Sequence, residues 1–124
     1  MKKAIVYVQS EFWGARGAQE QLVQERQCLA YAEELGYEVV RIFREAPWKK
    51  VKKGIQMQRI YKYLIELPEN SINCLIIQSP RVIARYKKDY LEYFSSLRAL
   101  GVKILPVIYK NKAHQTNEKE NKGC

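Results

Sequence analysis

A serine and several arginines lie where apolar stretches of the chain end. Ser10 closes the run AIVYVQS, and Arg44, Arg81 and Arg85 follow two later apolar runs. A serine hydroxyl attacks phosphorus when positive groups stabilise the phosphate oxygens, and the donor fork of arginine suits that task. These are the residue types that phosphoryl transfer needs. No base partner for Ser10 is evident, so a hydroxyl that merely forms a turn remains the alternative.

The elements that must position these residues alternate along the chain. Four runs rich in β-branched residues, 4–9, 38–44, 73–79 and 102–109, are separated by three amphipathic stretches. The helical stripes are Cys28, Tyr31, Ala32 and Leu35; Met57, Ile60, Tyr61 and Leu64; and Tyr90, Tyr93, Phe94 and Leu97. Gly36, Pro68 and Gly101 supply the helix stops. This order predicts an α/β fold, with a mainly parallel four-stranded sheet flanked by three helices and each stripe facing the core.

The loops after parallel strands gather at one edge of the sheet, where open α/β folds bind ligands. Ser10, Arg44 and the segment SPRVIAR, which contains Arg81 and Arg85, are expected there. Gln24 lies one turn before Cys28 and continues its stripe toward the same edge. Two readings of Gln24 are equally open: it faces Ser10, or it is a surface residue on the first helical turn.

Positive charge is concentrated in two segments. The formal net charge is +9, and residues 41–62 contain eight basic residues against the single acid Glu45. The second segment, residues 81–88, contains Arg81, Arg85, Lys87 and Lys88 and no acid. Such a distribution suits a polyanion such as nucleic acid, with a solubilising face as the alternative. The candidate phosphate-binding residues are Arg44, Lys49, Lys50, Lys52, Lys53, Lys87 and Lys88.

Length and composition limit the remaining possibilities. The 124 residues suffice for one domain, expected over residues 1–111, with a disordered polar tail over 112–124. The apolar runs are too short to cross a bilayer and no secretory signal is evident, so a cytoplasmic protein is expected. The cysteines have no metal-ligand spacing, so no metal site is expected; Cys28 and Cys74, among apolar neighbours, are interpreted as buried thiols.

Taken together, these segments resemble the resolvase/invertase serine recombinases over residues 3–108. The resemblance is carried by the first strand ending in serine, by QCLAYAEELGYEVVRIF, and by an arginine-rich turn followed by YLEYFSSLRALGVKIL. Its most specific parts are the Q-x3-C-x2-Y-A-x3-G register from Gln24 to Gly36 and the distance from Arg85 to RALGV. It implies a resolvase-like, flavodoxin-like layered fold.

The resemblance also implies a chemistry. In this family a serine attacks a DNA phosphodiester, becomes joined to the 5′ end and releases a 3′ hydroxyl, without a cofactor. Ser10 matches the nucleophile, Gln24 the active-site glutamine and Arg85 the last arginine of the D-R-x-x-R motif; Arg81 is the candidate to replace the other arginine. DNA is the implied partner, together with a second copy of the chain or a related recombinase.

Several positions depart from the family pattern. Val8 stands where the family has an arginine, Arg81 and Val82 stand where it has aspartate and arginine, and KKG replaces an R-P-G turn. Loss of one electrostatic stabiliser commonly costs about 2.7 to 4 kcal/mol in an active site. The departures therefore predict impaired catalysis, or a non-catalytic DNA-binding or regulatory module on the same fold.

A third hypothesis concerns the loop SEFWGARG. In a flavodoxin-like nucleotide or flavin binder, Gly14 and Gly17 would let the backbone approach a phosphate while Trp13 stacks on a ring. Packing at the sheet edge is the more common role for Phe12 and Trp13.

Overall fold

The computed structural model describes residues 2–10, 12, 14–45, 55–84 and 86–108. The expected tail at 112–124 lies outside them. The elements are β1 (Lys2–Gln9), α1 (Gly14–Leu35), β2 (Tyr37–Glu45), α2 (Ile55–Ile65), β3 (Cys74–Ile77), the 3-10 turn η2 (Pro80–Val82), α3 (Lys87–Ala99) and β4 (Lys103–Pro106). They alternate as predicted, although β3 and β4 are shorter than the apolar runs that contain them.

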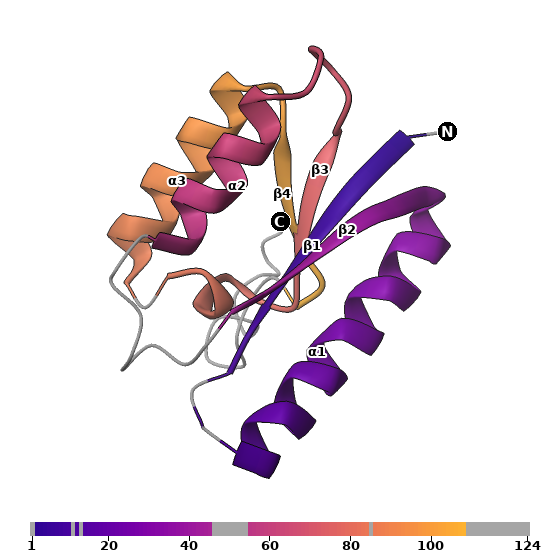
Figure 1. Ribbon diagram of the computed structural model, residues 1–124, viewed down its shortest axis with the longest axis vertical. Helices are drawn as coiled ribbons and strands as arrows, with labels where there is room; N and C mark the ends of the chain where they lie inside the picture. The colour runs from indigo at the N-terminus through magenta and orange to yellow at the C-terminus, as the bar shows by residue number, and fades with distance from the viewer. Residues whose placement is uncertain (1, 11, 13, 46–54, 85, 109–124) are drawn as a thin grey trace, which may run out of the picture.

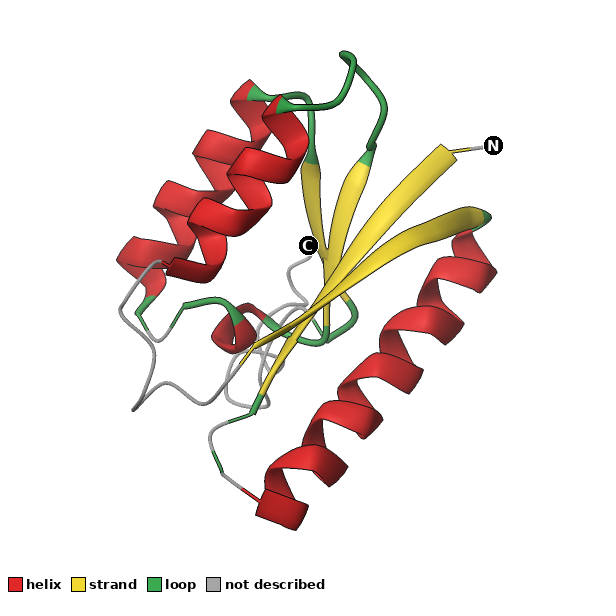
Figure 2. Cartoon of the chain, in the orientation of Figure 1, coloured by secondary structure: helices red, strands yellow, loops and turns green. Residues whose placement is uncertain are grey.

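The four strands form one parallel sheet in the order β2-β1-β3-β4. Helix α1 covers one face of the sheet, and α2 and α3 cover the other (Figures 1 and 2). This three-layer arrangement confirms the predicted α/β fold class. β1 is a central strand, and its residues 4–8 are inaccessible to solvent because helices cover both faces.

Each face of the sheet has its own core. On the α1 side, Val6 and Val8 of β1 pack with Cys28 and Ala32. On the other side, a larger cluster joins β1 and β3 to the predicted stripes of α2 and α3; its members include Ile5, Tyr7, Leu75, Met57, Ile60 and Leu97. Successive residues of β1 thus serve opposite layers, as the alternation of side chains along a strand requires.

Two stripe residues differ from the prediction. Leu35 is 47% exposed because it is the last residue of α1, beside the edge strand β2. Phe94 is 37% exposed and lies on the flank of its stripe, with its ring centroid 6.3 Å from that of Tyr90. Tyr90, Tyr93 and Leu97 face the core as expected.

Cys28 and Cys74 are buried free thiols, as predicted. Burial raises the pKa of Cys28 from 9.0 to about 12, with a further contribution from Glu25. Burial also raises the pKa of Cys74, to about 11, although a hydrogen bond with Tyr37 opposes the shift. Both shifts favour the protonated thiol in the folded state.

This preference makes stability depend on pH. The stabilisation is complete below pH 9, where the unfolded thiols are also protonated, and is lost as pH rises through 9 toward the folded values. Between pH 9 and 11 we expect the free energy of unfolding to fall by up to about 1.4 kcal/mol per pH unit for each thiol. Urea titrations should show this slope in Cys124→Ser, and a Cys28→Ala/Cys74→Ala variant of that protein should lack it. Equal slopes would contradict the burial effect.

Candidate functional site

The carboxyl ends of the parallel strands meet at one edge of the sheet. The chain passes from β1 outward to β2 on one side and returns to β3 on the other, so the switch in strand order lies between β1 and β3. Ser10 directly follows β1, while η2 follows β3 and contacts β1. Open α/β sheets bind ligands at such a switch point. Ser10 and the described part of the segment after β3 thus lie at the edge where they were expected.

The Ser10 hydroxyl closes a tight turn. Its Oγ accepts a hydrogen bond from the Phe12 N–H at 2.8 Å and donates one to the Phe12 carbonyl at 3.0 Å. Ser10 is only 1% exposed. The turn-forming role is thus present in this conformation, and a phosphodiester reaches Ser10 only if the turn opens.

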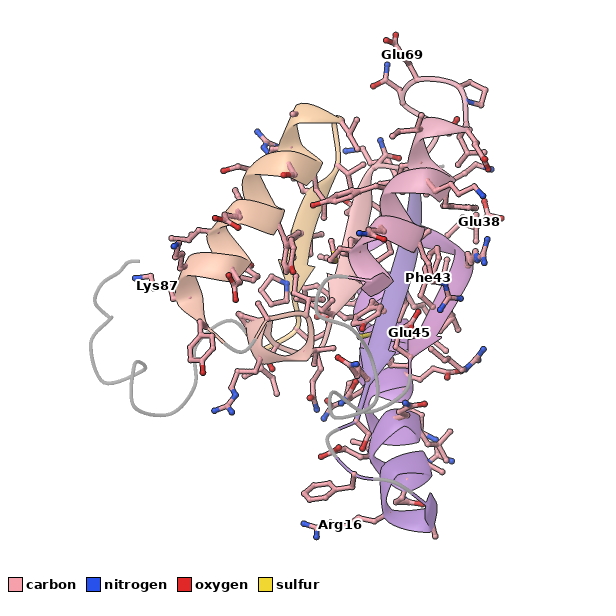
Figure 3. The ribbon with its side chains drawn as sticks, turned by 60° about the vertical axis from the view of Figure 1, so that its left-hand side comes forward. Arg16, Glu38, Phe43, Glu45, Glu69 and Lys87 are labelled. Carbon is pink, nitrogen blue, oxygen red and sulfur yellow. The ribbon has the colours of Figure 1, made fainter. Side chains whose placement is uncertain are left out.

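Gly17 permits this turn to pack against the first part of α1. A Cβ at position 17 would lie 2.0 Å from the Phe12 carbonyl oxygen and 3.1 Å from the Ser10 Oγ. On the outer side of the turn, the Arg16 guanidinium lies 3.6 Å from the centroid of the Phe12 ring. Figure 3 shows Arg16 at the end of α1 that extends beyond the sheet. The space that the nucleotide-binding hypothesis assigned to a phosphate at Gly17 is occupied by the protein's own backbone.

Gln24 is buried and binds the backbone immediately before Ser10. Its Oε1 accepts from the Gln9 N–H at 3.0 Å, and its Nε2 donates to the Gln9 carbonyl at 2.9 Å. The backbone groups of Lys3 point to the same side of β1 as those of Gln9, and the Lys3 carbonyl accepts a hydrogen bond from the Asn73 N–H, just before β3. Gln9 lies beyond the last β1–β3 pair, so the Gln24 amide occupies the position of a missing strand neighbour. The surface alternative for Gln24 is therefore wrong.

Two other glutamines extend this arrangement. Gln21 donates to the Glu45 carbonyl at the end of β2 at 2.7 Å, and Gln27 accepts from the Gln78 amide after β3, also at 2.7 Å. Together with Gln24, they connect α1 to the ends of three neighbouring strands. This set was not predicted, although its signal is visible in the sequence as three glutamines spaced three residues apart in QLVQERQ.

Arg44 differs from its expected placement after the second strand. It lies within β2, on the α1 face, and its guanidinium makes two hydrogen bonds to the Glu25 carboxylate, at 3.1 and 3.0 Å. A bulge at Val40 shifts the register between β1 and β2, which reverses the faces of the β2 residues that follow. Arg44 is thus held against α1 by an acid that the prediction did not consider.

A second ion pair connects the end of β2 to α2. The Glu45 carboxylate is buried and pairs with Arg59, whose side chain is half exposed. Glu45 lies opposite Gln9 in the β1–β2 ladder, next to the Ser10 turn. From the sequence, Glu45 was noted only as the single acid in a basic segment, and Arg59 only as one of its eight basic residues.

The other predicted site residues are only partly described. Arg81 is exposed in η2, and Lys87 and Lys88 are exposed in the first turn of α3. Val8, which stands where the resemblance expects an arginine, is fully buried beneath α1. The remaining candidates, Arg85, Lys49, Lys50, Lys52 and Lys53, lie outside the described residues, as do Trp13 and the tail.

The described ranges also lack two features. No group of three or more His, Cys, Asp or Glu side chains is arranged there to hold a metal ion. None of the helices described is both long enough and apolar enough to span a membrane. A pocket of about 450 Å³ lies between the ends of α2 and α3, lined in part by Leu64, Ile72 and Leu100, at the opposite edge of the sheet from Ser10.

Comparison with known proteins identifies the fold. No protein-family model and no curated protein sequence matches the chain. A resolvase family site-specific recombinase from Streptococcus pneumoniae superposes with a TM-score of 0.73 at 19% identity, covering 86% of this chain and 72% of that chain. The C-terminal catalytic domain of ISC1926 TnpA, an IS607-like serine recombinase, gives 0.67 at 19% identity, covering 92% and 76% of the two chains.

The N-terminal catalytic domain of TP901-1 integrase gives a TM-score of 0.66 at 16% identity, covering 86% of this chain and 77% of that chain. At identities this low, structural similarity shows the fold alone, and all three structures show the same fold. The chain has the fold of serine recombinase catalytic domains, which confirms the resolvase-like architecture expected from the sequence.

Proposed function

We propose that this domain of serine recombinase fold binds DNA and cleaves and rejoins its phosphodiester backbone through Ser10. One observation carries the proposal: Ser10 follows β1 and η2 follows β3, so they flank the switch point of the sheet. Hydroxyl and guanidinium groups at that point provide a nucleophile and a stabiliser for phosphoryl transfer.

The reaction proceeds by exchange of one ester for another. The Ser10 oxygen attacks phosphorus, the bond from phosphorus to the 3′ oxygen breaks, and the serine becomes joined to the 5′ phosphate. The proton lost by the serine is balanced by the proton gained by the released 3′ hydroxyl. Attack by a 3′ hydroxyl on the phosphoserine reverses the step and reseals a strand. The bond energy is retained, so no cofactor is needed.

The neighbouring residues take different parts in this reaction. Arg81 and Arg85 are proposed to stabilise the phosphate oxygens, as guanidinium groups do in phosphoryl transfer. Gln24 holds the backbone before Ser10 and acts as a positioning residue. With the apolar Val8 in place of the family's arginine, catalysis is expected to be impaired.

Binding to DNA is proposed to involve the basic segments outside the catalytic turn. Lys49, Lys50, Lys52 and Lys53 precede α2 in the sequence, and Lys87 and Lys88 begin α3. Each lysine that neutralises a phosphate releases a counterion and makes binding sensitive to salt. We propose residues 1–111 as the functional domain, acting as a homo-oligomer or paired with a related recombinase.

A second candidate function is a non-catalytic DNA-binding module. It is favoured by the Ser10 hydroxyl, which is buried and makes both of its hydrogen bonds to Phe12. Val8 supports it too, because a module that only binds DNA has no need of the arginine cluster. The two candidates differ in a single measurable product, the covalent phosphoserine linkage.

A suicide-substrate assay separates the candidates. Nicked DNA from the genomic neighbourhood of the coding sequence, labelled on the 3′ side of the cleavage point, is incubated with the protein and resolved on a denaturing gel. We expect a covalent protein–DNA band that Ser10→Ala abolishes. Ser79→Ala is the matched control: Ser79 lies at the same edge, before η2, and its side chain makes no capping hydrogen bond.

The possible outcomes decide between the two functions. A band that depends on Ser10 and not on Ser79 supports catalysis. Absence of a band together with salt-sensitive DNA binding supports the binding module. Absence of both contradicts a role on DNA altogether.

A further inference from the structure

Two exposed arginines lie along the junction between β2 and α2. This junction, called the β2–α2 seam, consists of Arg41, Phe43 and Glu45 from the strand and of Arg59 and Tyr63 from the helix. Figure 3 shows Phe43 and Glu45 following one another along β2 toward the edge of the sheet. Arg59 and Tyr63 are one helical turn apart, so they present neighbouring side chains to the strand.

Aromatic rings hold the first arginine. The Arg41 guanidinium lies 4.5 Å from the centroid of the Phe43 ring and 4.9 Å from that of Tyr63. The two rings are themselves fixed in an edge-to-face contact at 5.5 Å, and Phe43 is almost fully buried. Within the described ranges Arg41 has no carboxylate partner. Cation–π contacts orient a guanidinium without using its N–H donors, so those donors remain available.

A buried acid holds the second arginine. One N–H group of Arg59 points to the Glu45 carboxylate, whose side chain is 6% exposed, while 52% of the Arg59 side chain is open to solvent. Guanidinium has five N–H donors in a fixed fork, so a single contact with Glu45 leaves several directed outward. Glu45 thereby orients the guanidinium group of Arg59, which is exposed at the surface.

The seam ends at the candidate site. Glu45 lies opposite Gln9 in the ladder, and Ser10 follows Gln9. Glu38, an acid on the same strand as Arg41, pairs with Lys3 at 3.7 Å. Two guanidinium groups, each fixed by a partner before any ligand arrives, lose less side-chain freedom on binding and match phosphate oxygens in geometry.

We propose that the β2–α2 seam is a contact surface for a DNA phosphodiester backbone. Arg59 and Arg41 are the contacting groups, and Glu45 is a positioning residue for Arg59. The backbone of the bound strand runs along β2 toward the Ser10 edge. This inference rests on the proposed function in one respect, that DNA is the ligand; it does not require Ser10 to be catalytic.

The test measures how binding depends on salt. Fluorescence anisotropy with a labelled 30-base-pair duplex, repeated across a series of salt concentrations, is applied to the full chain and to Arg59→Ala, Arg41→Ala and Arg98→Ala. Arg98 is the matched control because it is an exposed arginine in the last turn of α3, at the opposite edge of the sheet. Circular dichroism and urea midpoints establish that each variant is folded.

The seam variants should behave differently from the control. Each lost phosphate contact is expected to reduce the slope of log affinity against log salt by about 0.9. The affinity itself should fall about tenfold or more, as for a lost charge-assisted hydrogen bond. Arg98→Ala should change neither quantity by a comparable amount. Arg59→Lys should keep the slope but bind more weakly, because lysine lacks the fork.

Whether Glu45→Ala raises or lowers the affinity for DNA tests the role of Glu45. If Glu45 contributed only negative charge, Glu45→Ala would tighten DNA binding. If it positions Arg59, Glu45→Ala weakens binding despite removing that charge, and Glu45→Gln, which keeps an acceptor oxygen, restores part of the affinity. Tighter binding of a folded Glu45→Ala protein would overturn the positioning role.

The remaining outcomes separate this inference from the proposed function. If the unmodified chain shows no salt-sensitive binding to DNA, the proposed function fails and the seam with it. If the chain binds DNA but Arg59→Ala and Arg41→Ala match Arg98→Ala, only the seam is overturned. If those two variants instead lower self-association in analytical ultracentrifugation without changing the salt slope, the seam contacts a second copy and the proposal is also overturned.

Discussion

Replacing Gly17 with alanine is expected to destabilise the fold by roughly 3 kcal/mol, at the upper end of the usual cost of overpacking. An added Cβ would lie 2.0 Å from the Phe12 carbonyl oxygen and 2.8 Å from its carbon, which are backbone atoms that cannot turn aside. Helix propensity alone predicts the opposite, since alanine is favoured over glycine inside a helix by about 1 kcal/mol. A loss of stability would therefore indicate the clash with Phe12, whereas a gain would indicate helix propensity. Urea denaturation of the two proteins measures it.

The same substitution should displace Ser10. The new methyl group would lie 3.1 Å from the Ser10 Oγ, so the Phe12 carbonyl and the serine must move together. We expect faster hydrogen exchange at the Phe12 amide, whose hydrogen bond to Ser10 is lost, and loss of any covalent DNA product. Ala18→Gly, at an exposed position in the same helical turn, is the matched control and should cost about 1 kcal/mol from propensity without altering Phe12 exchange. A more stable Gly17→Ala protein would show that the turn is not packed as described.

The layered fold was predictable because its strongest signals are local. Five consecutive apolar residues, 4–8, indicate a strand buried on both faces, and the structure has β1 at the centre of the sheet. Gly36 and Gly101 were predicted as helix stops; both adopt positive φ angles, +81° and +82°, that suit glycine. The alternation of strands with helices then leaves few topologies other than a parallel sheet.

The direction of individual side chains was less predictable. Arg44 was expected at the ligand-binding edge, but the bulge at Val40 turns it to the α1 face, where Glu25 accepts its hydrogen bonds. A single inserted residue reverses the faces of every residue that follows it in a strand. Hydrophobic pattern cannot locate such a bulge in a strand as polar as β2, because both faces carry charged residues.

Contacts between polar residues that are far apart in the sequence were also not predicted. The Glu45–Arg59 pair joins residues that sequence analysis treated only as opposite charges within one basic segment. Gln24 was left open between facing Ser10 and lying on the surface; it is buried, but its partner is the Gln9 backbone and not the Ser10 hydroxyl. The apolar periodicity of a helix shows which side chains point inward, whereas the acceptor that each one meets depends on the register of the strands beneath it.

Replacing Gln24 with leucine is expected to destabilise the fold by about 2 to 6 kcal/mol. The substitution keeps the approximate volume of the side chain but leaves the buried N–H and C=O of Gln9 without their amide partner. Each such loss costs about 1 to 3 kcal/mol. Gln27→Leu is the matched control, because Gln27 is exposed and its bond is to the Gln78 side chain; it should cost less than about 1 kcal/mol. Urea titrations of both variants provide the measurement.

Gln24→Glu separates the two halves of this contact. A carboxylate oxygen can still accept from the Gln9 N–H, but its second oxygen cannot donate to the Gln9 carbonyl and instead opposes it. At neutral pH this variant should be at least as unstable as Gln24→Leu, and it should recover as pH falls and the acid gains a proton that it can donate. The leucine variant has no such proton and should show no corresponding recovery. If the two variants had the same stability across the pH range, Gln24 would contribute packing and not hydrogen bonds at the end of β1. The position of Ser10 would then depend on the Phe12 turn and Gly17 alone.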